Sequence, residues 1–160
     1  MKLVDSSFKA QIKNMLRGYY VQKLQYHSSH RVKPPSQVEN RLKHSLRVAF
    51  LASKLSKIFL QNNKYAVRAA LLHDIGYTTV TPEFARNHHF DHSMRGFNLV
   101  QQKKEPSIII EAIRTHMFPM GPHPRTLFSF LIWFVDKLDW IIHLTKLKGF
   151  FNKYIDQTLT

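Results

Sequence analysis

Six histidine and aspartate side chains are spread along the chain in a pattern that could hold metal ions. They are His44, His73, Asp74, His92, His116 and Asp136. Each lies on or beside the apolar face of a predicted helix, so a helical bundle could bring them to one interior point. The chain contains ten histidines and no cysteine, which leaves histidine, aspartate and glutamate as the available protein ligands. This donor set favours iron or manganese and is compatible with magnesium, cobalt, nickel or zinc.

Asp136 is a carboxylate that directly follows an uncharged apolar stretch, residues 126–135. A buried and unpaired carboxylate is strongly unfavourable, so Asp136 requires a cation as partner. A lysine or arginine is one such partner, and a metal ion is the other. Asp139 and His143 share the predicted helix face of Asp136, where they either orient metal ligands or make ordinary buried hydrogen bonds.

Helical periodicity predicts an all-α, single-domain helical bundle. The predicted helices cover about residues 5–24, 36–60, 64–75, 91–100, 106–116 and 126–144, with a polar linker at 27–35 and a loop through Pro82. Asp5, a capping box at residues 36–39, Asn62 or Asn63, and Asp91 are the predicted N-terminal caps. Gly76 is predicted to end its helix in a left-handed conformation. The last helix is apolar almost all round, which predicts that it is buried.

Basic side chains are concentrated in the first half of the chain. Residues 1–70 hold 14 Lys and Arg but only two acids, whereas residues 71–160 hold ten basic and eight acidic side chains. Such a field attracts phosphates or nucleic acid. An alternative function is therefore a basic helical module that binds nucleic acid or another partner and keeps a structural or vestigial metal site.

The sequence also bears on the cellular location. The longest uncharged apolar run has ten residues, whereas a membrane helix needs about 20. The first residues lack the apolar core of a secretory signal. We therefore expect a cytoplasmic protein that does not enter a membrane.

Four segments, residues 40–49, 71–76, 113–117 and 135–138, carry His, then His-Asp, then His, then Asp. This pattern resembles the HD-domain superfamily of metal-dependent phosphohydrolases. The resemblance covers about residues 36–145 and implies an all-α bundle in which His44, His73, Asp74 and Asp136 hold a divalent metal. It also divides the chain into an N-terminal helix and linker (1–35), an HD domain (36–148) and a C-terminal tail (149–160).

Some branches of this superfamily add two histidines that complete a second metal site. His92 and His116 match these two by order and helix position, although His88 or His89 could replace His92 as the ligand. The chain is therefore similar to the bacterial branch that splits dinucleoside tetraphosphates symmetrically. Asp74 is the natural bridging ligand, because its two oxygens can reach both metals.

The resemblance implies hydrolysis of a phosphate ester or anhydride through a metal-bound hydroxide. The expected substrate is a small phosphorylated molecule, either a nucleotide or a dinucleotide. Asp74, Arg47 and Lys137 are the predicted catalytic residues, since positive charge beside the phosphoryl group stabilises its transfer. Arg47, Arg95, Lys137 and His89 are the predicted substrate-binding residues. The alternative for each basic side chain is an ordinary solvated charge.

Overall fold

The computed structural model describes residues 6–27, 40–59 and 63–143, together with 145, 149, 151–153 and 156. The elements assigned in these residues are all helices, which confirms the predicted all-α class. They are α1 (Ser6–Leu16), α2 (Tyr19–Lys23), η1 (Leu24–Tyr26), α3 (Arg41–Phe59), α4 (Asn63–Leu72), η3 (Ile75–Thr79), α5 (Pro82–Asn87), η4 (His89–Asp91), α6 (His92–Gln102), α7 (Ser107–Thr115) and α8 (Leu127–His143). The predicted caps at Asp5, 36–39 and Asn62, most of the linker and the domain limits at 36 and 148 lie outside the described residues.

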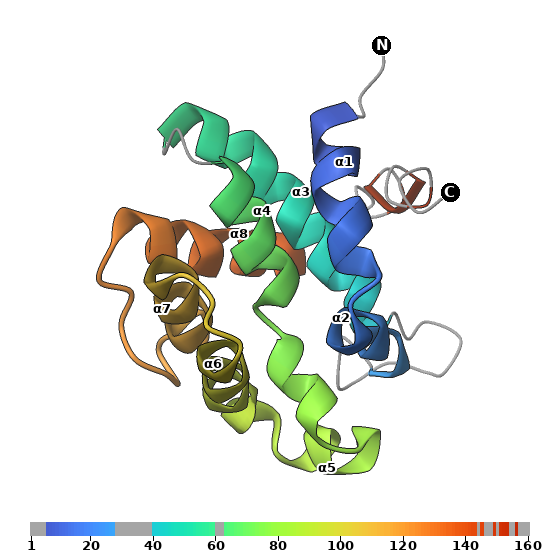
Figure 1. Ribbon diagram of the computed structural model, residues 1–160, viewed down its shortest axis with the longest axis vertical. Coiled ribbons are helices and arrows are strands. Elements are labelled where there is room, and N and C mark those ends of the chain that lie inside the picture. The colour runs from blue at the N-terminus through green and yellow to red at the C-terminus, as the bar shows by residue number, and fades with distance from the viewer. Residues whose placement is uncertain are drawn as a thin grey trace.

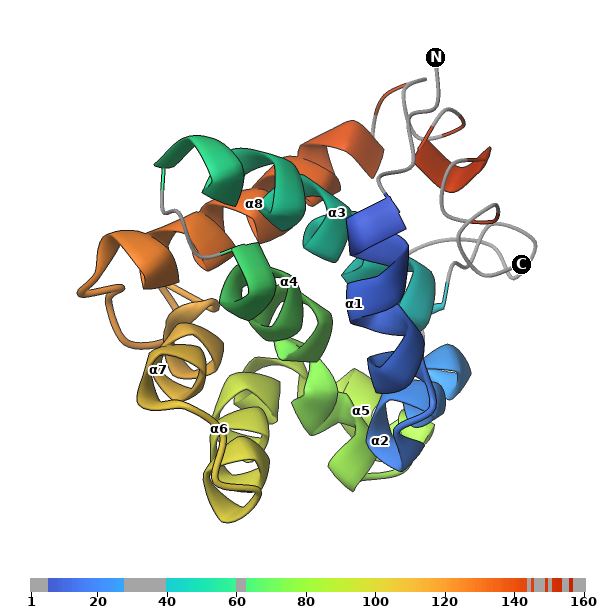
Figure 2. The same ribbon diagram turned by 45° about the horizontal axis from the view of Figure 1, so that its top comes forward.

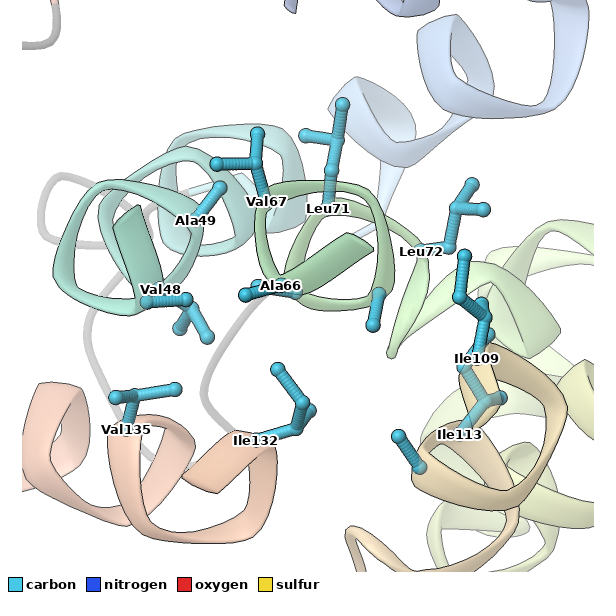
Figure 3. Packing of buried hydrophobic residues seen from close by; sticks show 14 of the residues in the cluster. Val48, Ala49, Ala66, Val67, Leu71, Leu72, Ile109, Ile113, Ile132 and Val135 are labelled. Atoms are coloured by element: carbon cyan, nitrogen blue, oxygen red, sulfur yellow. The ribbon is translucent and has the colours of Figure 1, made fainter. Parts of the chain in front are cut away.

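Helix α4 forms the centre of the bundle, with α3, α7 and α8 packed around it (Figures 1 and 2). Its small side chains, among them Ala66 and Ala70, are fully buried and allow the neighbouring helices to approach closely. Figure 3 shows Val48 of α3, Ile132 of α8 and Ile113 of α7 pointing toward α4. This central helix matters for function because its C-terminal end leads directly into His73 and Asp74.

The N-terminal segment packs on the same core but is not one continuous helix. Phe8 and Ile12 of α1 are buried in the core cluster. The backbone becomes extended at Gly18, with φ −67° and ψ 131°, and α2 then begins in a new direction. As a result Tyr19 is 65% exposed, although a continuous helix over residues 5–24, as predicted, would place it on the same face as the buried Phe8 and Ile12.

Gly76 has a different role from the predicted left-handed helix end. No described glycine has a positive φ, and the chain continues from α4 through a turn into η3. A Cβ atom at Gly76 would collide with the carbonyl oxygen of His92 and lie 2.5 Å from the amide nitrogen of Gly96. The glycine is therefore required by the close approach of η3 to α6, and this contact holds Asp74 next to His92.

Replacement of Gly76 by alanine is expected to push α6 away from η3. Overpacking of this kind costs about 1–3 kcal/mol of unfolding free energy, which urea denaturation would measure. Gly121→Ala is the matched control, because its Cβ would meet only ordinary contacts of 3.5–3.8 Å. Equal stability of the two variants would contradict the proposed role of the glycine contact.

Two further local predictions differ from the structure. Residues 82–87 form the helix α5 rather than a loop, since Pro82 starts the helix and the Thr81 side chain accepts a hydrogen bond from the amide of Phe84. Asp91 precedes α6 but makes no side-chain capping bond. Its carboxylate instead lies 3.7 Å from Arg95 Nη1, one turn further along α6.

Helix α8 is only half buried, although its composition predicted burial all round. One face packs on α3 and α7 with Ile132 and Val135. The large apolar side chains of its other face are exposed: Leu127, Phe130, Phe134, Trp140 and Ile141. Apolarity predicted the helix correctly, but only tertiary packing decides which side of it is covered. No helix in the described part of the chain is long and apolar enough to span a membrane.

Candidate metal centre

All six predicted ligands come together at one place in the bundle. His44 lies in α3, and His73 and Asp74 follow the end of α4. The other three belong to the neighbouring helices: His92 begins α6, His116 follows α7, and Asp136 lies in the middle of α8. Five of these side chains are at most 6% exposed and Asp136 is 12% exposed.

The ligands form two groups with Asp74 between them. In each group the ligand atoms lie within 4.8 Å of one another; the groups are His44, His73 and Asp136, and Asp74, His92 and His116. Oδ2 of Asp74 lies 3.5 Å from Nε2 of His44 and 3.4 Å from Nε2 of His73. Its Oδ1 lies 3.0 Å from Nε2 of His92 and 3.7 Å from Nε2 of His116. The two oxygens thus face different groups, which is the geometry needed to bridge two cations.

The other ring nitrogen of three histidines is fixed by a hydrogen bond. Nδ1 of His73 donates to the carbonyl oxygen of Ala70 at 2.6 Å, and Nδ1 of His116 donates to that of Ile113 at 2.7 Å. Nδ1 of His44 lies 2.8 Å from Oδ2 of Asp139. These bonds leave Nε2 of each ring free of its proton when a metal binds, and they set the ring orientation.

Asp139 is the carboxylate that connects His44 to Arg47. It is fully buried, and it accepts hydrogen bonds from Arg47 Nε at 2.7 Å and Arg47 Nη2 at 2.9 Å. Burial alone would raise the pKa of Asp139, but His44 and Arg47 outweigh it and lower the pKa to about 2. The sequence left two roles for Asp139, to orient a metal ligand or to make an ordinary buried hydrogen bond. Its contact with Nδ1 of His44 matches the first role.

Arg47 therefore does not face the ligand cluster as its spacing from His44 suggested. Its guanidinium is fully buried, and Nη1 donates to Oδ1 of Asn152 at 2.9 Å while the other nitrogens bind Asp139. Asp139 thus lies between Arg47 and Nδ1 of His44, and the contact of Arg47 with substrate stays a prediction. Arg47 lies one helical turn after His44 on α3, but its guanidinium is directed by the buried carboxylate of Asp139 on α8.

Arg41 is the basic residue at the site that the sequence reasoning missed. Its Nη1 pairs with Oδ2 of Asp74, and its guanidinium lies 3.7 Å from the centre of the Tyr77 ring. Tyr77 in turn stacks on His92 with ring centres 4.3 Å apart. The sequence contains a signal for this position, because Arg41 precedes His44 by three residues and Arg47 follows it by three, so both lie one helical turn from His44.

Of the remaining predicted site residues that the structure describes, one lies at the cluster and two lie elsewhere. Lys137 Nζ donates to Oδ2 of Asp136 at 2.7 Å. Arg95 instead binds the backbone carbonyls of Gly76 and His88, each at 3.3 Å. His88 is exposed and stacks on Phe84, which leaves His92 rather than His88 in the cluster. The side chain of His89 lies outside the described part of the structure.

The two groups differ in the protonation of their histidines. Burial alone would lower the pKa of His73, but the nearby carboxylates of Asp74 and Asp136 raise it to about 10. Burial dominates at His92 and lowers its pKa to about 3. Burial would raise the pKa of Asp74, but Arg41 and His73 hold it well below its usual range. At neutral pH without metal, His73 is therefore protonated and His92 is neutral.

Metal binding is consequently expected to release protons. A cation at His73 must displace a proton held with a pKa of about 10, so the apparent affinity should fall by about tenfold per pH unit for each proton displaced as the pH is lowered. Isothermal titration calorimetry with Mn²⁺ in two buffers of different ionisation enthalpy would count these protons. Identical apparent enthalpies in both buffers would contradict the expectation.

The donor set suits divalent cations. Four imidazole nitrogens and two carboxylates gather without a thiolate, and both groups contain at least two histidines and one carboxylate. Mixed sets of this kind suit iron and manganese. The residues present thus fit two divalent metals, one for each group.

Comparison with known proteins identifies a family for this chain. The HD domain family matches residues 41–141. Ribonuclease Y of Acholeplasma laidlawii is 36% identical over 102 residues, which cover 62% of this chain and 18% of that protein. Ribonuclease Y of Helicobacter pylori is 37% identical over 78 residues, covering 49% of this chain and 14% of the relative.

A third relative gives the same result. Ribonuclease Y of Aquifex aeolicus is 34% identical over 98 residues, which are 61% of this chain and 15% of that protein. The chain therefore spans less than a fifth of the length of these relatives. No solved structure matches it. The family match covers more than half of the chain and includes every residue of the ligand cluster, so this protein belongs to the HD-domain family.

Proposed function

We propose that this protein is a metal-dependent phosphodiesterase that hydrolyses RNA. The observation that carries the hydrolytic part is the position of Asp74, whose two oxygens face two separate groups of candidate ligands. Two divalent cations bound there would supply Lewis acidity toward both the phosphate and the attacking water. The name of the relatives, ribonuclease Y, supports RNA rather than the small nucleotide expected from the sequence.

In this proposal His44, His73 and Asp136 would hold one cation, His92 and His116 would hold the other, and Asp74, which lies between the two groups, would contribute to both. Water adds to the phosphorus and the bond to one ribose oxygen breaks, with the proton passing to the leaving oxygen. One product then ends in a phosphate and the other in a hydroxyl. Because the nucleophile is water, the 2′-hydroxyl takes no part and no 2′,3′-cyclic phosphate forms.

Arg41 and Lys137 are the proposed phosphate-binding residues. Each pairs with a ligand carboxylate, Arg41 with Asp74 and Lys137 with Asp136, so both carry positive charge to the edge of the cluster. A charge fixed in this way stabilises the extra negative charge of the phosphoryl group in the transition state. Arg47 is proposed as a positioning residue, which acts on His44 through Asp139.

The experiment is to incubate the purified protein with a 5′-labelled single-stranded RNA of 20 nucleotides and Mn²⁺, Fe²⁺ or Mg²⁺. A parallel set contains EDTA, and another contains dinucleoside polyphosphates and cyclic nucleotides in place of RNA. We expect metal-dependent RNA cleavage with phosphate and hydroxyl ends. Cleavage of dinucleotides with intact RNA would overturn the proposed substrate and restore the small one, whereas failure to bind any of the metals would overturn the hydrolytic function.

A further inference from the structure

A groove of about 430 Å³ lies apart from the ligand cluster, between the N-terminal helices and α6. Its floor includes Leu72 and Ile75, which flank His73 and Asp74 in the chain. In Figures 1 and 2, α2 and α6 stand on opposite sides of the segment that joins α4 to η3. The same short segment thus contributes to the metal centre and to this groove. The volume falls in the range of about 300–1,000 Å³ that ligand sites commonly have.

Two tyrosines line the groove, each with a lysine beside it. Tyr19 is 65% exposed, and its ring lies edge-on to Tyr20 with ring centres 5.3 Å apart. Lys23 Nζ lies 4.8 Å from the centre of the Tyr19 ring, and Lys103 Nζ lies 5.6 Å from that of Tyr20. Exposed aromatic rings next to cations are the combination that proteins use to stack bases and to contact the phosphates of a single strand.

The surroundings of the groove are strongly basic. The described residues between 6 and 72 include lysines and arginines but neither aspartate nor glutamate. Lys13, which is exposed on α1, precedes the groove residue Asn14, and Arg17, which directly follows α1, is exposed as well. Glu105, the acid in the groove lining, is held by Arg68, with Nε and Oε2 2.7 Å apart. The positive charge around the groove therefore complements a polyanion rather than a cationic or neutral ligand.

We propose that this groove binds a single-stranded segment of the RNA, with a base stacked on Tyr19 and backbone phosphates beside Lys23 and Lys103. The identity of the polymer rests on the proposed function, whereas the location rests on the groove itself. The site holds the strand at a distance from the bond that is cleaved.

The test measures binding of a fluorescein-labelled 12-nucleotide oligouridylate by fluorescence anisotropy in EDTA, where no metal-dependent cleavage occurs. Tyr19→Ala is expected to weaken binding by about 5- to 100-fold, because a stacked base loses its aromatic partner. Lys103→Gln is expected to reduce the slope of log affinity against log salt by about 0.7. Circular dichroism and thermal melting would verify that both variants fold.

Phe130→Ala and Lys57→Gln are the matched controls, since both replace exposed side chains outside the groove lining. We expect the controls to bind RNA like the wild type. Equal affinity of Tyr19→Ala and Phe130→Ala, or equally tight binding of an RNA duplex, would overturn the groove proposal. Hydrolysis of RNA with Mn²⁺ is measured separately. Absence of cleavage by the wild type would overturn only the proposed function, and loss of binding in Tyr19→Ala would still support the groove.

Discussion

Asp74→Asn is expected to reduce RNA hydrolysis by at least about 10²- to 10³-fold, the range seen when a group that stabilises transition-state charge is removed. The neutral amide offers one oxygen in place of two charged ones, so it cannot face both ligand groups as Asp74 does. The metal content should fall from two ions per chain to one or none. Inductively coupled plasma mass spectrometry on the dialysed, Mn²⁺-loaded protein would measure this content alongside activity.

The matched control for this variant is Asp91→Asn. Asp91 precedes the ligand His92 in the chain, but its side chain is 63% exposed and lies near Arg95 rather than the cluster. The control should keep both metals and full activity. If Asp74→Asn retained two metals and cleaved RNA at the wild-type rate, the bridging role of Asp74 would be excluded.

Asp139→Asn is expected to have the largest effect on stability. Asp139 and Arg47 are both fully buried, so removing the negative charge leaves the guanidinium without its counter-charge. Loss of one partner of a buried ion pair costs about 3–5 kcal/mol, which urea denaturation of the metal-free protein would measure. Metal affinity should also fall, by about 10- to 100-fold, because Nδ1 of His44 loses its carboxylate acceptor.

A double variant separates the two effects of Asp139. Replacing the pair by apolar residues, Arg47→Met with Asp139→Leu, removes both buried charges and should recover most of the lost stability. Metal affinity should stay low, since the His44 ring still has no acceptor. If affinity returned together with stability, Asp139 would have only a structural role.

The candidate site was more accessible to sequence reasoning than its surroundings. Local helical periodicity predicts that His44, His73 and Asp74 lie on or beside apolar helix faces, and the apolar faces of a helical bundle meet in one interior. The direction of Arg47 and the role of Gly76 depend instead on residues far away in the chain, Asp139 and His92. Local patterns identify which residues face inward, whereas long-range contacts decide what each residue meets there.

The helices show the same division. The end of α3 at Phe59 and the limits of α8 agree with the predicted ranges, since apolar periodicity and polar flanks are encoded locally. The break at Gly18 and the exposed face of α8 were not predicted. Both depend on how much of an apolar surface the neighbouring helices cover, and the composition of a segment does not predict this coverage.

The hydrogen bonds on the Nδ1 atoms make the metal centre unequally robust to genetic change. His73 and His116 are oriented by main-chain carbonyl oxygens of Ala70 and Ile113, and every amino acid that replaces those residues keeps a carbonyl there. His44 depends on the side chain of Asp139, which one codon change can delete. Under relaxed selection, random mutation would therefore disrupt the His44 group sooner than the group of His116. A gene copy in that situation would pass through a stage in which only one of the two metal-binding groups is intact.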